Sequence, residues 1–366
     1  MEEEGKKRAQ LKSILVPSVQ ELAKESSERV PDRYVRPFDD QERPILAVDD
    51  HVPEDNDGLQ VPVVNMEALL SGDGQELQKL HLACQEWGFF QVINHGVDSS
   101  VVEKFKRETQ EFFNLGMEEK RKYWQTATEV EGFGQVFVVS EQQKLDWADL
   151  FYVTTLPKTE RSPRLLPLFP LPYRDTIDTY SAEVANLAMK ILDCMAKALN
   201  IDTDVLRAVF CEGRQLFRMN YYPPCPQPDK VIGLTPHSDS VALTILLQLN
   251  DMEGLQIKKD GKWVPVKPLP HAFVVNIGDI LEMVTNGIYK SVLHRAVVNA
   301  TKERLSVAAF HSPANDREIG PIPSLITTEA PARFKRISMI DYIEGLFARQ
   351  LDGKSYLDTM RIYNRK

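Results

Sequence analysis

The pattern His237-Ser238-Asp239, followed by His294, is the feature of this 366-residue chain that most directly indicates chemistry. Side chains two residues apart in an extended strand point to the same face, so His237 and Asp239 can face one point. His294 lies in a separate β-like run, residues 291–295. If the two strands lie side by side, two imidazoles and one carboxylate converge on one face of a metal ion. Such a facial triad is typical of non-haem Fe(II) oxygenases, because O₂ and a co-substrate both need open coordination positions.

A second pair, Arg304 and Ser306, follows ten residues after His294 and shares one face of a strand. A guanidinium fork with a neighbouring hydroxyl suits the binding of a carboxylate. We therefore expect a 2-oxo acid to chelate the metal with one end and to place its distal carboxylate on Arg304 and Ser306. Tyr222 can add a phenolic hydrogen bond to that carboxylate.

Two other functions are compatible with these residues. Zinc accepts the same three ligands, although a catalytic zinc typically keeps one open position, so a metal-dependent hydrolase is one alternative. A non-catalytic binding module on the same fold is the other. It would be expected to lack a ligand or Arg304, and none of them is missing. Oxygen uptake coupled to succinate formation distinguishes the oxygenase from the hydrolase.

Four further residues are candidates for the substrate pocket. Phe310 and Phe137 are plausible lining aromatics, although core packing would explain them nearly as well. Arg218 either points into the site or pairs with an acidic neighbour. His311 lies just past the Arg304 strand and is a candidate substrate contact. Among the other histidines, His81 is expected to be structural, His95 to form a hydrogen bond in a turn and His271 to lie at the surface.

The residues from about 216 onward predict short strands separated by turns. This spacing favours an antiparallel sandwich or barrel. Lys259-Asp260-Gly261-Lys262 is a hairpin signal. The predicted strands cover 216–222, 242–249, 255–257, 263–266, 272–277, 292–298 and 305–310.

Helices dominate the preceding part of the chain. Apolar residues at helical spacing predict a long scaffold helix over 173–199 that packs on a sheet. Helices before strands indicate an α+β architecture. Upstream we expect an edge strand from Val61, a helix ending near Trp87, a strand over 89–93 and a helix over 101–113, and residues 129–140 suit the lining of a cleft. A last helix is expected over 339–349.

These elements suggest a division of the chain into five parts. The Asp-, Glu- and Pro-rich stretch 39–58 is expected to be flexible, within a loosely held lead-in. The expected parts are a lead-in (1–60), an N-terminal dioxygenase domain (61–165), scaffold helices (166–212), the metal-binding core (213–313) and a C-terminal helical extension (314–366).

The composition limits the partners that this chain can have. With a net charge of −9, the chain lacks the excess of basic residues that is typical of nucleic-acid-binding proteins. The same negative charge disfavours binding to a membrane surface. No apolar stretch approaches a membrane span, and the charged N-terminus is not a secretory signal. The four cysteines are widely spaced, so we expect them to be reduced thiols: Cys84, Cys194, Cys211 and Cys225. We expect a cytoplasmic protein, a monomer, with small-molecule partners.

Several motifs make the chain resemble the plant 2-oxoglutarate/Fe(II)-dependent dioxygenases. The residues that carry the resemblance are RMNYYPPCPQP (218–228), GLTPHSD (233–239), NGIYKSVLHR (286–295) and WGFFQVINHG (87–96). The similarity extends over about residues 14 to 360. Within the family the chain is similar to the senescence-related SRG1-like subgroup and to the poppy alkaloid O-demethylases, through ILVPSVQEL (14–22), GFGQ (132–135) and LDWADL (145–150).

The resemblance implies a double-stranded β-helix (jelly-roll) core with an N-terminal α/β region and a long scaffold helix. It implies Fe(II) ligation by His237, Asp239 and His294. It also implies 2-oxoglutarate binding by Arg304, Ser306 and Tyr222, with Asn220 nearby, and ascorbate as reductant. The expected reaction is hydroxylation, O-demethylation or desaturation of an aromatic plant specialised metabolite, such as an alkaloid, flavonoid, coumarin precursor or indole. Succinate and CO₂ are the expected co-products.

Overall fold

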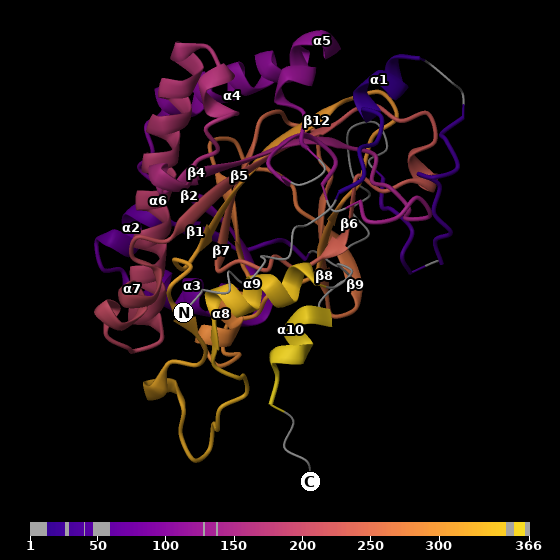
Figure 1. Ribbon diagram of the computed structural model, residues 1–366. Helices are drawn as coiled ribbons and strands as arrows, with labels where there is room; N and C mark the ends of the chain where they lie inside the picture. The colour runs from indigo at the N-terminus through magenta and orange to yellow at the C-terminus, as the bar shows by residue number, and fades with distance from the viewer. Residues whose placement is uncertain are drawn as a thin grey trace, which may run out of the picture.

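Two β-sheets face each other in the computed structural model, which describes residues 13–25, 29–39, 41–46, 59–126, 129–136, 138–348 and 355–362. Within these residues the larger sheet has eight strands and the smaller has four (Figure 1). The larger sheet has the order β1 (Val63–Asn65), β2 (Phe89–Ile93), β10 (Phe273–Ile277), β7 (Leu243–Gln248), β12 (Arg304–Ser312), β5 (Arg214–Tyr222), β4 (Asp149–Leu156) and β3 (Gly132–Gly134). The smaller sheet has the order β6 (Leu234–His237), β11 (His294–Ala296), β8 (Leu255–Lys259) and β9 (Lys262–Pro265).

The expected jelly-roll core with helices around it is confirmed, and each strand predicted beyond residue 216 is present. The predicted hairpin joins β8 to β9, with Asp260 and Gly261 both at positive φ (49° and 81°). Positive φ at both central residues is the requirement of a type I′ turn, which matches the twist of the two strands. The edge strand expected from Val61 is β1, at the end of the larger sheet.

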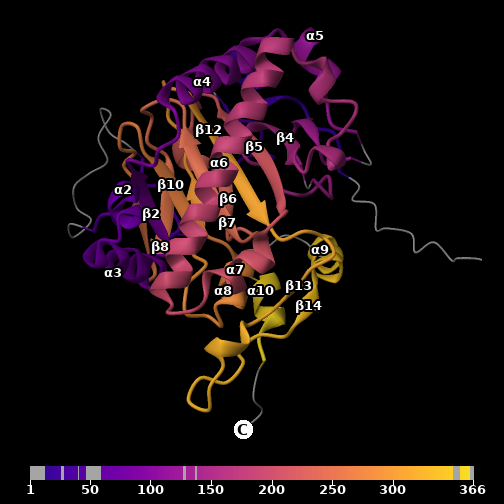
Figure 2. The same ribbon diagram turned by 90° about the vertical axis from the view of Figure 1, so that its left-hand side faces the viewer.

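The long helix α6 (Leu171–Ala198) covers the outer face of the larger sheet, as predicted. Figure 2 shows α6 in front of the strands, with α4 (Ser99–Asn114) above it. Phe105 of α4 stacks on Tyr180 of α6 at a centroid distance of 4.0 Å, and Tyr180 contacts Phe217 of β5 edge-on at 5.6 Å. This aromatic layer fixes the helices on one side of β5, so the opposite face of that strand is free to form a site.

The N-terminal part of the chain shares the larger sheet with the core. β1 and β2 extend one side of it, while β3 and β4 extend the other. β4, which no periodicity predicted, pairs with β5 over nearly its whole length. The five-part division therefore stays a prediction, because backbone hydrogen bonds cross the boundary expected at residue 213.

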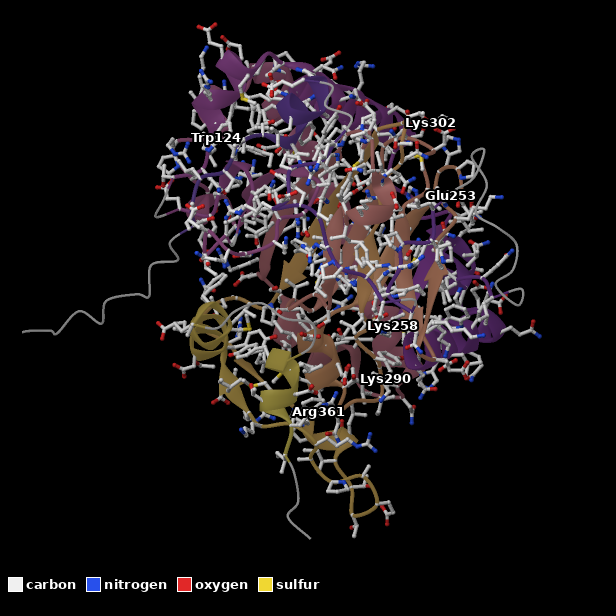
Figure 3. All side chains as sticks on the ribbon, turned by 90° about the vertical axis from the view of Figure 1, so that its right-hand side faces the viewer. Trp124, Glu253, Lys258, Lys290, Lys302 and Arg361 are labelled. Atoms are coloured by element: carbon white, nitrogen blue, oxygen red, sulfur yellow. The ribbon has the colours of Figure 1, made fainter. Side chains whose placement is uncertain are left out.

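Parts of the lead-in pack against the rest of the protein, so the expectation that it is loosely held is wrong for its buried residues, among them Val16, Val19, Val30 and Tyr34. The buried Asp149 accepts hydrogen bonds from Ser18 Oγ and from the backbone N–H groups of Val19 and Gln20, at the start of α1 (Val19–Lys24). Further along, Glu42 binds Lys258 of the smaller sheet at 2.6 Å (Figure 3, where Lys258 is labelled). Most of the stretch 39–58 lies outside the described residues.

Shorter elements complete the molecule. The helix expected to end near Trp87 is α3 (Gly74–Leu82), which continues as a π-helical turn over Ala83–Trp87. The C-terminal helix α9 (Met339–Phe347) begins where predicted. The remaining helices and strands are α2 (Met66–Leu70), α5 (Met117–Lys120), α7 (Thr203–Phe210), α8 (Asp279–Val284), β13 (Glu318–Ile319), β14 (Ile337–Ser338) and α10 (Ser355–Met360). No helix in the described part of the chain is long and apolar enough to cross a membrane.

Candidate active site

The strand pairing of the smaller sheet brings His237, Asp239 and His294 together. His237 ends β6 and lies directly across from His294, the first residue of β11. One ligand atom from each residue lies within 4.8 Å of the other two. Asp239 Oδ1 is 3.5 Å from Nε2 of His237 and 3.7 Å from Nε2 of His294. Three potential ligands thus face one point, as the spacing of the residues predicted.

The backbone sets which nitrogen of each imidazole faces that point. His237 Nδ1 lies 2.8 Å from the carbonyl oxygen of Thr235, and His294 Nδ1 lies 3.2 Å from that of Val292. A carbonyl can only accept, so each Nδ1 carries the proton and each Nε2 keeps its lone pair. Metal-binding histidines are held in this way in proteins.

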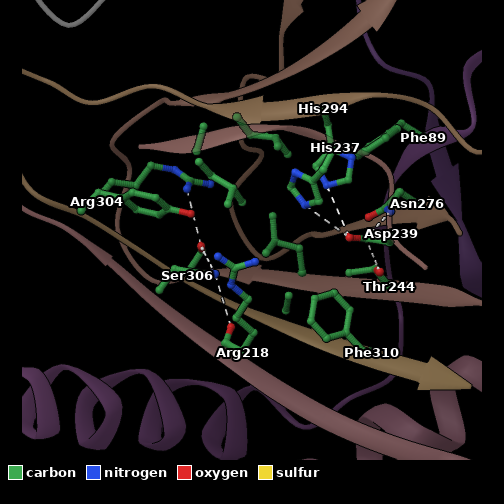
Figure 4. A pocket seen from close by; sticks show the side chains of 17 residues that line it. Phe89, Arg218, His237, Asp239, Thr244, Asn276, His294, Arg304, Ser306 and Phe310 are labelled. Carbon is green, nitrogen blue, oxygen red and sulfur yellow. Dashed lines mark hydrogen bonds and ion pairs between the residues drawn. The ribbon is translucent and has the colours of Figure 1, made fainter. Parts of the chain in front are cut away.

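The carboxylate of Asp239 is oriented by two donors from the larger sheet. The hydroxyl of Thr244 in β7 donates to Oδ2 at 2.6 Å, and the side-chain amide of Asn276 in β10 donates to the same oxygen at 2.8 Å. Both bonds go to Oδ2, which leaves Oδ1 facing the two imidazoles (Figure 4). The chemistry of the site fits one monodentate carboxylate and two neutral imidazoles on a divalent metal.

Electrostatics favour this protonation state. Burial, reinforced by the neighbouring His237, lowers the pKa of the His294 imidazole to about 4. Burial by itself would raise the pKa of Asp239, but the two imidazoles and the Thr244 hydroxyl outweigh it and hold that pKa well below its usual range. At neutral pH the site therefore presents a carboxylate beside a neutral His294, as a cation site requires.

The carboxylate-binding residues predicted from the sequence lie in the same pocket, on paired strands. Arg304 and Ser306 of β12 lie opposite Tyr222 and Asn220 of β5. The Arg304 guanidinium lies 5.3 Å from the centre of the Tyr222 ring, and its Nη1 donates to Ser306 Oγ at 3.5 Å. Asn220 Nδ2 also donates to Ser306 Oγ, at 3.4 Å. A buried cation, a hydroxyl and a phenol thus converge at the end of the pocket away from the triad (Figure 4).

Two residues that sequence reasoning missed hold Arg304 in place. Gln248 Oε1 accepts from Arg304 Nη2 at 3.0 Å. Gly254 gives the side chain room, because a Cβ at this position would lie only 2.8 Å from Arg304 Cδ. Thr244 and Asn276 were missed as well. Their signal is weak, since each is one polar residue within an apolar strand, and only the register brings them to Asp239.

Apolar side chains from both sheets enclose the rest of the pocket. They are Phe89, Leu234, Leu246, Leu255, Ala296, Ala308 and Phe310. Phe310 and Arg218 line the pocket, at the end opposite Arg304 and Tyr222 along β12 and β5. Phe137 lies outside the described residues.

The interpretation of His311 as a substrate contact is wrong. Alternation along β12 points Arg304, Ser306 and Phe310 into the pocket and His311 to the opposite face. There His311 Nε2 lies 3.1 Å from Nε2 of Gln215, and burial lowers the pKa of His311 to about 4. The same alternation was available in the sequence, because Arg304 and His311 are an odd number of residues apart.

Of the other histidines outside the triad, His81 and His95 make local contacts and His271 is exposed, as expected, while His51 lies outside the described residues. His81 Nδ1 lies 3.1 Å from the Tyr289 hydroxyl. His95 Nε2 lies 3.1 Å from the carbonyl oxygen of His271. Neither contact is in the pocket of the triad.

Comparison with known proteins gives matches along most of the chain. A family model described as 2OG-Fe(II) oxygenase superfamily matches residues 213–313, and one described as non-haem dioxygenase in morphine synthesis N-terminal matches residues 61–170.

Similar curated proteins match from end to end. Protein SRG1 of Arabidopsis thaliana is 57% identical (98% of this chain, 100% of the relative), and oxoglutarate-dependent flavonoid 7-O-demethylase 1 of Ocimum basilicum is 56% identical (96% and 93%). Thebaine 6-O-demethylase of Papaver somniferum is 54% identical (95% and 96%). The crystal structure of JOX2 in complex with 2OG, Fe and JA superposes with a TM-score of 0.84 at 33% identity, covering 95% of this chain and 98% of that one.

Proposed function

Since the chain belongs to the 2OG-Fe(II) oxygenase superfamily, we propose that it removes the methyl group from a methoxylated aromatic metabolite of plants. The protein is an Fe(II)- and 2-oxoglutarate-dependent dioxygenase. The resemblance to the SRG1-like subgroup and to the poppy O-demethylases is confirmed. The hydrolase and the binding module are set aside, because relatives of nearly full length are dioxygenases and demethylases.

The metal site is the observation that carries the proposal. His237 and His294 through Nε2, and Asp239 through Oδ1, would hold Fe(II), because these three atoms face one point within a buried pocket. Thr244 and Asn276 keep the carboxylate turned toward the ion. A facial set of three ligands leaves the remaining positions for a chelating 2-oxo acid and O₂.

The other polar end of the pocket would hold the co-substrate. The Arg304 fork, the Ser306 hydroxyl and the Tyr222 phenol are suited to the distal carboxylate of 2-oxoglutarate. Asn220 lines the same pocket, and its side-chain amide, which donates to Ser306 Oγ at 3.4 Å, would help to position this hydroxyl. Because Arg304 is buried, its charge is poorly screened by water, which strengthens its attraction for a carboxylate.

The bound iron supplies oxygen activation, by which O₂ and 2-oxoglutarate become succinate and CO₂ while a substrate C–H bond is hydroxylated. For an aryl methyl ether, hydroxylation of the methyl carbon gives a hemiacetal. This hemiacetal breaks down to the phenol and formaldehyde. One oxygen atom of O₂ enters succinate, and the other leaves in formaldehyde. The apolar walls formed by Phe89, Leu246 and Phe310 keep water out and receive the aromatic ring.

Relatives favour demethylation over the other reactions open to this family. Enzymes named for O-demethylation of a flavonoid, thebaine and codeine are 49–56% identical to this chain over nearly its full length. One of them acts on a flavonoid and two on alkaloids. Removal of an O-methyl group is the reaction that these names share with the proposal.

The test is a screen of methoxylated flavones and methoxylated alkaloids with the purified protein, Fe(II), 2-oxoglutarate and ascorbate. We expect one or more compounds to release succinate and formaldehyde in equal amounts. Succinate release with a hydroxylated product and no formaldehyde would refute demethylation. His237→Ala is the blank, and its product formation should fall to the background of the assay.

A further inference from the structure

We propose that Asp279 is a positioning residue of the metal site, which holds the two chain segments that carry the ligands at a fixed separation. The inference goes beyond demethylation and rests, within the proposed function, on the ligation of Fe(II) by His237, Asp239 and His294. It is carried by one buried carboxylate that lies outside the triad and binds both segments.

The ligands lie on two segments whose strand pairing ends at the ligands. β6 ends at His237, β11 begins at His294, and these two residues are paired with each other. Residues 238–239 and 291–293, which continue the two segments, lie outside both strands. Asp239 is in the first of these stretches, so its position relative to His294 depends on contacts beyond the strand pair.

The start of α8 packs against the segment that carries Asp239. The backbone N–H of Asp279 donates to the carbonyl oxygen of Asp239 at 2.8 Å. Gly278 permits this close approach, because a Cβ at position 278 would lie 2.1 Å from the carbonyl oxygen of Val241 and 3.0 Å from that of Asp239. The first turn of α8 therefore lies directly against the backbone of a metal ligand.

The two oxygens of the Asp279 carboxylate bind one segment each. Oδ2 accepts from Ser238 Oγ at 3.1 Å, and Oδ1 accepts from Ser291 Oγ at 2.6 Å. Ser238 lies between the first two ligands, and Ser291 lies three residues before the third. Asp279, Ser238 and Ser291 are only 2%, 7% and 3% exposed, so water competes little for these hydrogen bonds. A carboxylate suits this position because it can accept from both hydroxyls at once.

A second acidic residue of α8 supports the segment that carries His294. Glu282 Oε2 accepts from the backbone N–H of Ser291 at 2.8 Å, and Glu282 Oε1 accepts from Arg361 Nη2 at 2.8 Å. Glu282 thus holds the backbone of Ser291, while Asp279 holds its hydroxyl. Asp279 in addition reaches the segment of Asp239, so it connects the two halves of the metal site.

The metal site needs such a connection because its ligand atoms repel one another. Asp239 Oδ1 lies 3.5 Å from Nε2 of His237 and 3.7 Å from Nε2 of His294, and each of these atoms carries a lone pair. Their repulsion is relieved only when a cation lies between them, so the surrounding structure must hold them together beforehand. Residues that orient the ligands typically contribute about tenfold to a hundredfold to metal affinity.

The test measures the Kd for Fe(II) by anaerobic competition with a chromogenic chelator. Asp279→Ala removes both connections and should raise this Kd by about tenfold to a hundredfold. Asp279→Asn keeps the shape of the side chain and one acceptor oxygen, so it should raise the Kd less. Ser291→Ala removes one connection and should raise the Kd by about threefold to tenfold in the wild type, but by less than about twofold in Asp279→Ala.

A matched control separates positioning from general stability. Asp149→Asn changes another buried carboxylate, which accepts from a serine hydroxyl and two backbone N–H groups. It should lower the urea midpoint of unfolding but leave the Kd for Fe(II) within twofold of the wild type. The visible absorption of the Co(II)-loaded protein, which reports the geometry of the ligands, should change in Asp279→Asn and not in Asp149→Asn.

A Kd for Fe(II) within twofold of the wild type in both Asp279 variants would overturn the inference, as would an equal loss of affinity in Asp149→Asn. His237→Ala distinguishes this failure from a failure of the proposed ligation. If His237→Ala loses Fe(II) while the Asp279 variants keep it, only the inference is refuted. If His237→Ala binds Fe(II) as the wild type does, the ligation is refuted and the inference with it. Missing formaldehyde alongside the expected Kd values would refute demethylation alone.

Discussion

Replacing Thr244 by valine tests whether the orientation of Asp239 determines the affinity for iron. The side chains have nearly the same shape, and Thr244 is buried, so the change removes one hydrogen bond of 2.6 Å and little else. A hydrogen bond to a charged group contributes about 1.5–3 kcal/mol, which corresponds to roughly tenfold to 150-fold in an equilibrium constant. Because Asn276 still donates to Oδ2, we expect the lower end, about a tenfold rise in the Kd for Fe(II).

The measurement is anaerobic competition for Fe(II) between the protein and a chromogenic chelator. Thr154→Val is the matched control, because this buried threonine donates to Glu131 at 2.5 Å from a neighbouring part of the sheet. Thermal unfolding of both variants checks that the fold is retained. If Thr244→Val binds Fe(II) within twofold of the wild type, or if both variants weaken binding equally, the argument from carboxylate orientation is refuted.

Three further predictions concern the co-substrate, the pH dependence of stability and the backbone. Arg304→Gln should raise the KM for 2-oxoglutarate by about tenfold to a hundredfold, and an unchanged KM in initial-rate assays would remove Arg304 from that role. Burial lowers the pKa of Lys120 to about 8, whereas the pKa of this lysine in the unfolded chain is near 10.5. Between these two pH values the unfolded chain binds more protons than the folded protein, so the free energy of unfolding rises with pH. From pH 8 to pH 9.5, the urea midpoint of the wild type should therefore increase relative to the urea midpoint of Lys120→Met. A difference between the two midpoints that stays constant over this range would contradict the lowered pKa of Lys120. Gly88 has a φ of 63°, and a Cβ at this position would lie 2.2 Å from the carbonyl oxygen of Lys290. Gly88→Ala should therefore lower the free energy of unfolding, measured in urea, by more than about 2 kcal/mol. A decrease below about 1 kcal/mol would argue against strain at this position.

The lead-in shows why local sequence by itself did not predict order. Within residues 13–46, Val16, Val19, Val30 and Tyr34 are buried. Tyr34 packs edge-on against Trp147 at 5.3 Å, and Arg36 pairs with Asp146 at 2.8 Å. These partners are more than a hundred residues away in the chain, so no local pattern could indicate them.

Local patterns in the sequence did determine the chemistry of this protein. Two ligands at i and i+2, a histidine in a second strand, and Arg304-x-Ser306 are short-range motifs, since alternation along a strand fixes which side chains share a face. The same alternation and the turn residues around Gly261 also gave the strands and the hairpin. The residue types then limited the metal and the co-substrate.

Only the tertiary structure decided how those groups are supported. Asn276 lies 37 residues from Asp239 and Gln248 lies 56 residues from Arg304 in the chain, and only the register of β7, β10 and β12 brings each pair together. The physical reason is that a hydrogen bond requires its two atoms to lie within about 3 Å, and such proximity between distant segments exists only after the sheets have formed.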